Sequence, residues 1–313
     1  QESDALYSRL RSLVDRAQDP SVKAVLVAAM MGAVHRREGA SALEQLGLIA
    51  AGVSQTCEEA GVENGARFTL ENTRACAEIS LGNYAKAAQI CAVAREVSIR
   101  MGSDEHRSAA AANLAMCSGR LGSYSEQQRW SHEAIKHSGT STPSWRLEKA
   151  RFYLASALAM SGQTRAAMEV KLPEDSSLAG SPAWMVQANL LLKADLYMLC
   201  GHDGLAKKYA VEGLSAAGNR AASSVYAGPI ARWIALLSAD DKVRMETDSL
   251  VELYSRCSHL DLVDQAEVTA AMRVVRSRAG LDCSEESKSL QELLGRLPPA
   301  VSSQLQRLGV LGS

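Results

Sequence analysis

The four residues Leu81-Gly82-Asn83-Tyr84 decide the fold, because versions of them return at a nearly fixed interval along the chain. They are followed by Leu121-Gly122-Ser123-Tyr124, Ser161-Gly162-Gln163-Thr164 and Cys200-Gly201-His202-Asp203, whose glycines continue the series at spacings of 40, 40 and 39 residues. Gly39 and Gly280 extend the pattern in both directions. Self-similarity at such an interval is typical of proteins that stack one supersecondary unit on the next. The sequence therefore predicts a repeat architecture.

Apolar stretches of helical periodicity precede each glycine, and a second stretch usually follows it. A glycine between two helices takes the left-handed conformation that ends a helix without steric cost. Strand-like alternation is scarce, and seven prolines among 313 residues leave room for long helices. We therefore expect an all-α chain built from helix pairs.

The expected helices cover residues 3–16, 21–37, 41–59, 67–81, 84–101, 104–121, 125–137, 145–161, 163–171, 184–200, 204–217, 221–239, 242–259, 261–279, 285–296 and 299–308. Within this order, residues 170–182 contain two prolines and a glycine, so we expect a loop that shortens the second helix of its repeat. Whether this loop is a hinge stays open. We expect a single domain, with an N-terminal repeat and cap at 1–62, central repeats at 63–280 and C-terminal capping helices at 281–313.

Composition excludes several classes of protein. The formal net charge is −1, without the basic excess that a sequence-independent nucleic-acid binder shows. The longest mainly apolar runs, 25–34 and 227–239, fall short of the roughly 20 residues that a membrane span needs. Seven cysteines without a C-x-x-C pair indicate free thiols in a reducing compartment, so we expect a cytoplasmic protein. The chain begins at Gln1 and not at Met, which is compatible with a piece of a longer protein.

Motifs that carry chemistry are missing from the sequence. Neither glycine-rich phosphate loop occurs, and no H-E-x-x-H, G-x-S-x-G or zinc-type cluster of Cys and His is present. We therefore expect no metal, no cofactor and no catalytic residue. Catalytic groups can still converge from distant segments, so an enzyme remains an alternative.

The pattern resembles the tetratricopeptide repeat, in which a helix, a Gly-Asp/Asn-Tyr turn and a second helix with small residues follow one another. Gly82, Asn83 and Tyr84 match that turn, while Gln127 departs from the pattern by replacing an alanine. The small-residue sites carry Ala75, Ala115, Ala155 and Ala194 in first helices, and Ala87, Ala94, Ala134, Ala167, Ala206 and Gly213 in second helices. The resemblance implies a right-handed superhelical solenoid of antiparallel helix pairs, with about seven repeats of about 40 residues. The interval of about 40 residues is longer than that of the standard tetratricopeptide repeat. It is similar to the interval of the repeats in the sensor region of MalT-like bacterial regulators.

In tetratricopeptide arrays the first helix of each repeat lines a concave groove. Residues of this chain that align with the groove-lining positions of the repeat are therefore expected to line a similar groove. The groove residues expected from the resemblance are Asn72, Cys76, Asn113, Met116, Arg120, Lys149, Tyr153, Ser156 and Asp195. One subclass binds a C-terminal carboxylate with five polar groups. Asn113 and Lys149 match two of them, but Thr73 and Tyr153 replace required groups, so this peptide class is not expected.

Three functions remain open from the sequence. The first is an interaction or effector-sensing scaffold within a larger signalling or regulatory protein, whose groove binds a peptide, a protein or a small ligand. The second is the helical substrate-binding portion of an enzyme. The third is a purely structural array, with an oligomeric state that the sequence does not define. Partners are expected to be neither nucleic acid nor membrane.

Overall fold

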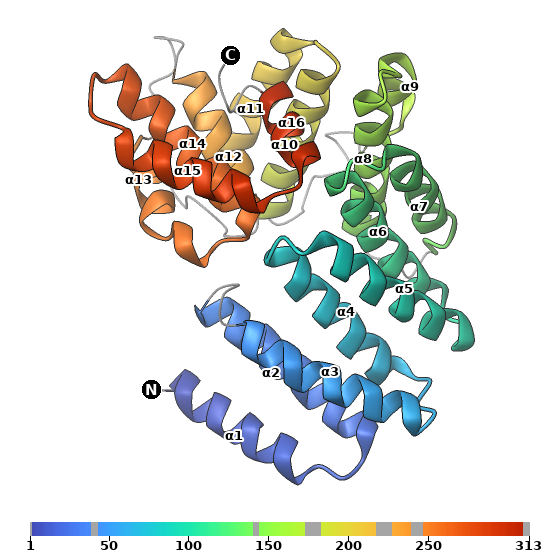
Figure 1. The fold of residues 1–313 in the computed structure, drawn as a ribbon. Helices are drawn as coiled ribbons and strands as arrows, with labels where there is room; N and C mark the ends of the chain where they lie inside the picture. Colours follow the sequence, from blue (N-terminus) through green and yellow to red (C-terminus); the bar gives the residue numbers. More distant parts are fainter. Residues whose placement is uncertain are drawn as a thin grey trace.

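The computed structural model describes residues 2–38, 43–139, 144–172, 183–216, 227–238 and 247–308, and within these ranges the chain is helical without any strand (Figure 1). The first eight helices are α1 (Glu2–Arg16), α2 (Pro20–Glu38), α3 (Leu43–Glu59), α4 (Gly65–Ser80), α5 (Tyr84–Arg100), α6 (Asp104–Arg120), α7 (Tyr124–Lys136) and α8 (Ser144–Met160). The following eight are α9 (Thr164–Glu169), α10 (Ala183–Leu199), α11 (Asp203–Ala216), α12 (Ala227–Leu237), α13 (Thr247–Ser255), α14 (Leu262–Arg278), α15 (Ser284–Arg296) and α16 (Pro299–Arg307). The expected all-α class is confirmed.

The helix starts predicted at residues 221 and 242 lie outside the described residues. The other predicted bounds agree with the structure to within two residues, except at the end of α13. There the α-helix stops at Ser255, and a 3₁₀ turn covers Cys257–His259. The shortened second helix is confirmed, since α9 has 6 residues. Most of the loop predicted at 170–182, and with it the question of a hinge, lies outside the described residues, as does Gly39.

Helices pack in neighbouring pairs along the chain. Each even-numbered helix from α2 to α14 contacts the odd-numbered helix that follows it, so seven pairs lie between α1 and α16 in the described parts of the chain. Helices α2, α4, α6, α8 and α10 also contact one another in this order, and α12 packs on α14. Figure 1 shows the pairs following one another along a curved row, from the blue N-terminal helices to the orange and red C-terminal ones.

The glycine turns have the predicted conformation. Gly82, Gly122, Gly162, Gly201 and Gly280 have φ angles of 80°, 78°, 79°, 78° and 69°, which only glycine adopts freely. At the first turn the N–H of Gly82 donates to the Ile79 carbonyl at 2.9 Å, which closes α4.

Two of these glycines also contact helices that are far away in the sequence. A Cβ at Gly82 would lie 2.6 Å from Leu262 Cδ2, and a Cβ at Gly122 would lie 3.0 Å from the Ala300 Cβ. The turns after α4 and α6 are therefore docking points for α14 and α16.

Small residues lie between the paired helices, as predicted. Ala75, Ala115, Ala155 and Ala194 are fully buried. Gln127 replaces one of the expected alanines, and Gly119 on the neighbouring helix provides the space for its larger side chain. A Cβ at Gly119 would come within about 2.5 Å of the Gln127 Oε1. A small residue on the first helix thus makes room for a large one on the second.

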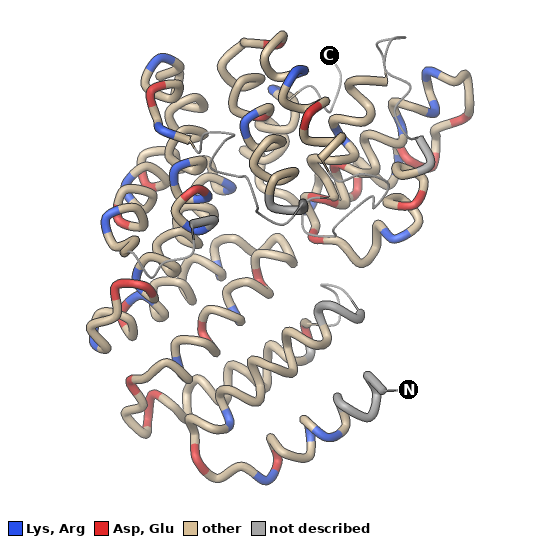
Figure 2. Tube along the Cα trace, turned by 180° about the vertical axis from the view of Figure 1, so that it is seen from behind, with Lys and Arg blue, Asp and Glu red and all other residues tan. Residues whose placement is uncertain are grey.

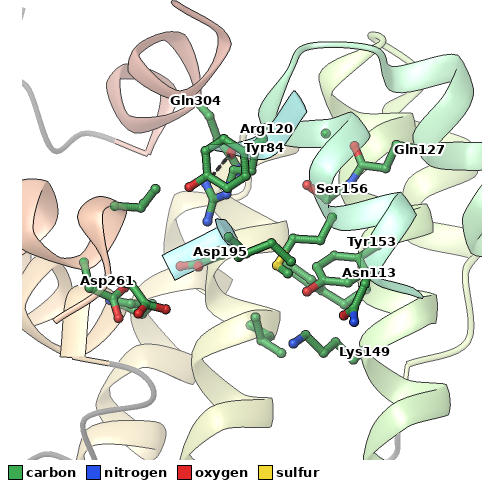
Figure 3. A pocket seen from close by; sticks show the side chains of 18 of the residues that line it. Tyr84, Asn113, Arg120, Gln127, Lys149, Tyr153, Ser156, Asp195, Asp261 and Gln304 are labelled. Atoms are coloured by element: carbon green, nitrogen blue, oxygen red, sulfur yellow. Dashed lines mark hydrogen bonds between the residues drawn. The ribbon is translucent and has the colours of Figure 1, made fainter. Parts of the chain in front are cut away.

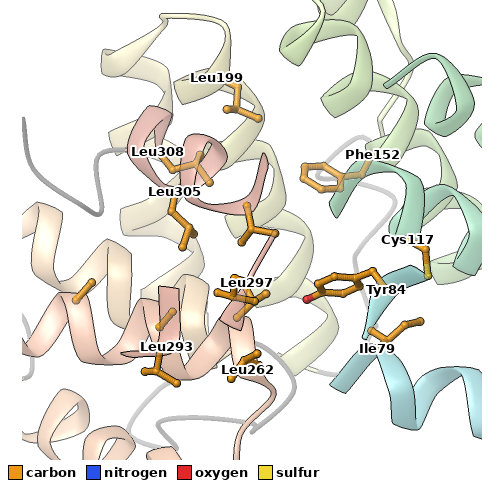
Figure 4. Close-up of a cluster of buried hydrophobic side chains, with 14 of the residues drawn as sticks. Ile79, Tyr84, Cys117, Phe152, Leu199, Leu262, Leu293, Leu297, Leu305 and Leu308 are labelled. Carbon is orange, nitrogen blue, oxygen red and sulfur yellow. The ribbon is translucent and has the colours of Figure 1, made fainter. Parts of the chain in front are cut away.

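The last helices close the row onto its middle. A central apolar core joins Tyr84 and Phe152 to Leu262, Leu297 and Leu305, and Figure 4 shows Tyr84 and Phe152 facing the leucines of the C-terminal helices. Helix α16 contacts α6 directly, in addition to the expected packing of α15 on α14. Residues 299–307 therefore lie across the inside of the row and do not merely extend its end.

Arginine side chains fix this closure at helix ends. Arg307 donates to the carbonyl oxygens of Ala159 at 3.4 Å and Leu199 at 3.1 Å, which belong to the last turns of α8 and α10. Carbonyls in a last helical turn lack intrahelical partners, and a cation there also interacts favourably with the helix dipole. One side chain of α16 thereby links two inner helices.

Positively and negatively charged residues are interspersed along the described chain (Figure 2), in keeping with the formal net charge of −1. Among the described helices, none combines the length and the hydropathy that crossing a bilayer requires.

Candidate functional site

A cavity of about 330 Å³ lies where the inner helices face the C-terminal helices. Side chains from α4 to α8, α10, α12, α14 and α16 line it, so its wall combines segments from most of the chain (Figure 3). Lysine and asparagine lie on one side of this cavity, and carboxyl groups lie on the other.

The structure brings the predicted groove residues together. Eight of them line the cavity: Cys76, Asn113, Met116, Arg120, Lys149, Tyr153, Ser156 and Asp195. The ninth, Asn72, does not line it, but its Oδ1 accepts a hydrogen bond of 2.9 Å from the Asn113 side-chain amide. The register inferred from small residues and glycines therefore selected one contiguous surface.

The polar side of the cavity holds Asn113, Lys149, Tyr153 and Cys76. The Lys149 Nζ lies 5.7 Å from the centre of the Tyr153 ring, within range of a cation–π interaction. The Cys76 thiol is open to the cavity yet surrounded by protein, and this burial raises its pKa although Lys149 opposes the shift. The thiol is thus protonated at neutral pH and a weak nucleophile.

Apolar side chains form the middle of the wall. They are Ile79, Tyr84, Met116, Phe152, Met160, Leu192 and Val263. Burial raises the pKa of Tyr84 to about 12, so its hydroxyl stays neutral. Tyr84 belongs to the turn motif, and its contribution to the cavity was not predicted.

Arg120 connects the cavity to the C-terminal helix. Its guanidinium donates to the Gln304 Oε1 at 3.0 Å, and Figure 3 shows this pair at one edge of the cavity. The predicted groove residue Arg120 therefore also holds α16 in place.

Asp195 is engaged within the protein. Its Oδ1 accepts from Arg232 and from the Trp233 indole N–H, and its Oδ2 accepts from Arg232, each at 2.8 Å. The Arg232 side chain is 1 % exposed. Burial alone would lower the pKa of Arg232, but the charges of Asp195 and Glu267 raise it. This arrangement makes Asp195 the counter-ion of a buried cation, although it lines the cavity.

Two further carboxyl groups, Asp264 and Glu267, lie three residues apart on α14 and line the same side of the cavity. The Glu267 Oε1 lies 3.6 Å from the Arg232 Nε. Burial raises the pKa of Asp264 well above its usual range, and the charges of Glu267 and Asp261 add to the effect. Burial also raises the pKa of Glu267, partly offset by Arg232 and reinforced by Asp195.

These two carboxyl groups were missed by sequence reasoning, although a signal was present. In the segment 261–268 the acidic residues Asp261, Asp264 and Glu267 lie three positions apart and are separated mainly by apolar residues. Residues at i and i+3 share one helix face, so an acidic stripe crosses an otherwise apolar helix. The register set by the glycines and the small residues extends only over the earlier repeats. It could not show that α14 returns to face α4 and α6.

No family model, curated protein or solved structure matches this chain. Across the described ranges, no group of three or more His, Cys, Asp or Glu side chains is arranged to hold a metal ion. The chemistry of the lining residues therefore carries the functional argument.

Proposed function

We propose that this chain is an effector-sensing scaffold that binds a small ligand, or the end of a peptide, in its central cavity. The observation that carries the proposal is the cavity itself, whose wall draws on helices far apart in the sequence, from Cys76 on α4 to Gln304 on α16. The helix-pair interval and the buried alanines support a tetratricopeptide-like, right-handed solenoid as the underlying architecture.

The dimensions favour a small ligand over a long peptide. Pockets for small molecules enclose roughly 300–1,000 Å³ and combine apolar walls with a few placed polar groups. The cavity lies at the lower end of this range, and α16 lies across the inner helices where an extended peptide would run. We therefore propose a more enclosed site than the concave groove expected from the sequence.

Ligand binding at this place would act on the arrangement of the helices. A ligand that contacts α6 and α8 on one side and α12 and α14 on the other stabilises their closed arrangement over any looser one. This is the property that a sensor needs. We propose that the chain passes this signal on as part of a larger regulatory protein in the cytoplasm.

A substitution that fills the cavity tests the proposal. Ser156 lines the cavity and is buried, so Ser156→Leu adds two non-hydrogen atoms to the side chain and places them in the ligand's space. In a thermal-shift screen of small molecules, a ligand at a hundred times its Kd stabilises the wild-type protein by roughly 2.7 kcal/mol. The variant should lose this stabilisation.

Ser215→Leu is the matched control, because Ser215 is exposed on α11 and does not line the cavity. Met116→Phe provides a second filling variant at a half-buried lining position. Ligand stabilisation that survives in both filling variants would place the binding site elsewhere and refute the proposal.

A second candidate function is the substrate-binding portion of an enzyme. The observation in its favour is the pair of raised carboxyl pKa values at Asp264 and Glu267, since a general acid needs a proton near neutral pH. Its test is turnover: a bound ligand should be consumed, and Asp264→Asn should abolish consumption while leaving measurable binding. A ligand recovered unchanged after prolonged incubation contradicts this alternative.

A further inference from the structure

Two carboxyl oxygens converge beside a glycine at one end of the cavity. A Cβ at Gly228 would lie 2.6 Å from the Asp264 Oδ1, and it would also collide with the Glu267 Oε2. The Asp264 carboxylate additionally accepts the backbone N–H of Gly228. Because Gly228 has no side chain, both oxygens fit against the backbone of α12, next to the cavity-lining residue Pro229.

One of these oxygens lacks a donor. Glu267 is 4 % exposed, and its Oε2 is buried without a hydrogen-bond partner anywhere in the described residues. Buried polar atoms in native proteins are nearly always hydrogen-bonded, so an orphan acceptor in a cavity wall requires an explanation. Arg232, the nearest cation, already gives two hydrogen bonds to Asp195.

The charges around this point are unbalanced. Asp264 and Glu267 are faced by Asp195 from α10 and by Asp261 from the start of α14, against Arg232 from α12 and Arg120 from α6. Four carboxyl groups thus meet two guanidinium groups. An additional positive charge placed here would be favoured by every carboxylate in the group.

We infer that the ligand of this cavity is a small organic cation, whose ammonium or guanidinium group binds between Asp264 and Glu267 while an apolar body lies against the cavity wall. This inference rests on the proposed function. Tyr84, Phe152 and Leu192 supply the apolar wall, and the cation supplies the N–H donors that the Glu267 Oε2 lacks.

Binding is coupled to proton release. Burial raises the pKa of both carboxyl groups, so at a pH below these raised pKa values the empty site holds a proton on the pair. When the ammonium group enters, the carboxyl O–H bond breaks, the proton goes to water, and N–H···O contacts to the carboxylate replace it. Since an alkylamine stays charged up to about pH 10, affinity rises with pH until the carboxyl pair is ionised in the empty site.

Three probes of similar shape test the inference on the full chain. Phenethylamine carries the cation, 2-phenylethanol is its neutral counterpart and 3-phenylpropionate reverses the charge. Titrations followed by protein NMR should show the amine binding saturably at about millimolar concentration, with the two other probes at least about tenfold weaker. Calorimetry in two buffers of different ionisation enthalpy should show proton release that accompanies the amine alone.

Charge-removing variants locate the cation. Asp264→Asn and Glu267→Gln should each weaken phenethylamine at least about tenfold and reduce the proton release, while 2-phenylethanol binds as before. Glu212→Gln on α11 is the matched control, because its carboxylate is exposed and distant from the cavity lining. Circular dichroism melts verify that each variant is folded, and unchanged 2-phenylethanol binding verifies an intact cavity.

The outcomes separate the inference from the proposed function. If the alcohol or the carboxylate binds as tightly as the amine, or if calcium alone occupies the site in its place, the organic-cation inference is overturned and the cavity remains a ligand site. If the amine binds but Asp264→Asn and Glu267→Gln leave its affinity unchanged, the inference is also overturned. If none of the probes binds at about 10 mM and the wider screen is empty as well, both ideas fail.

Discussion

Removing the Asp195 carboxylate should destabilise the fold strongly, even though this residue was predicted from the sequence as a ligand contact. In Asp195→Ala the guanidinium of Arg232 loses both of its 2.8 Å partners, and the Trp233 N–H loses its acceptor. The Arg232 and Asp195 side chains are 1 % and 9 % exposed, so little water can replace the lost groups.

The magnitude follows from this burial. Breaking a buried ion pair by deleting one partner costs about 3–5 kcal/mol, because the remaining charge is left uncompensated. Glu267 lies 3.6 Å from the Arg232 Nε, so it compensates the charge near this nitrogen but leaves the other two guanidinium nitrogens without a partner. We therefore expect a decrease of about 3–5 kcal/mol in the free energy of unfolding for Asp195→Ala, and about 1.5–3 kcal/mol for Asp195→Asn, which keeps an acceptor.

Urea unfolding followed by circular dichroism measures these values, and the exposed pair Arg256–Glu252 provides the control. That pair has a similar N···O distance of 2.9 Å, but both side chains are more than half exposed, so Glu252→Ala should cost about 0.5 kcal/mol or less. The double variant Asp195→Leu with Arg232→Met should be more stable than Asp195→Leu alone, since it removes the stranded charge. A loss below about 1 kcal/mol for Asp195→Ala would refute the structural role, since deleting a buried partner should cost several times more.

Three further predictions follow from the same structure. Asp264→Asn should stabilise the protein more at about pH 8 than at about pH 5, because a carboxyl with a raised pKa holds its proton in the folded state, and its contribution to stability declines as pH rises toward that pKa. Thermal melts at both pH values test this, and an equal gain at each would contradict it. Gly122→Ala should cost more than Gly162→Ala, since both glycines have positive φ but only the first meets Ala300; equal losses in urea unfolding would argue against the docking of α16. Leu305→Ala should cost about 2–5 kcal/mol, because Leu305 is completely buried in the central core, and hydrogen exchange should rise in α16 first; protection that is unchanged there would show that α16 contributes little.

The local architecture could be predicted from the sequence because local rules determine it. A glycine that ends one helix and an alanine that lets two helices approach are properties of a repeat and its immediate neighbours. Ala155 and Gly162 could therefore be assigned without knowledge of the remainder of the chain. The exchange of size between Gly119 and Gln127 obeys the same rule, but the repeat pattern marks only the departure at Gln127 and does not point to Gly119 as the residue that makes room for it.

The site was predictable on one side only, for a physical reason. The residues on α4, α6 and α8 follow one another in the register, so Asn113 and Lys149 could be placed on one face. Asp264 and Glu267 reach that face through the closure of α14 and α16, which depends on contacts between residues about 180 positions apart, such as Arg120 with Gln304. No periodicity within a repeat encodes such a contact.

The position of the cavity suggests how a bound ligand would act on the protein. The N-terminal helices α1 to α3 belong to a separate apolar core around Val27, Met30 and Leu46, and none of their residues lines the cavity. The cavity instead lies between α4–α8 and α10–α16, whose shared core includes Tyr84 and Leu305. A ligand shifts an equilibrium only by the difference between its contacts in two states. A cation that needs Asp264 on one side and the aromatic wall on the other loses contacts whenever these two groups of helices separate. The binding free energy therefore stabilises the closed arrangement of these two groups of helices. The N-terminal helices α1 to α3 respond only through the packing of α2 and α3 on α4.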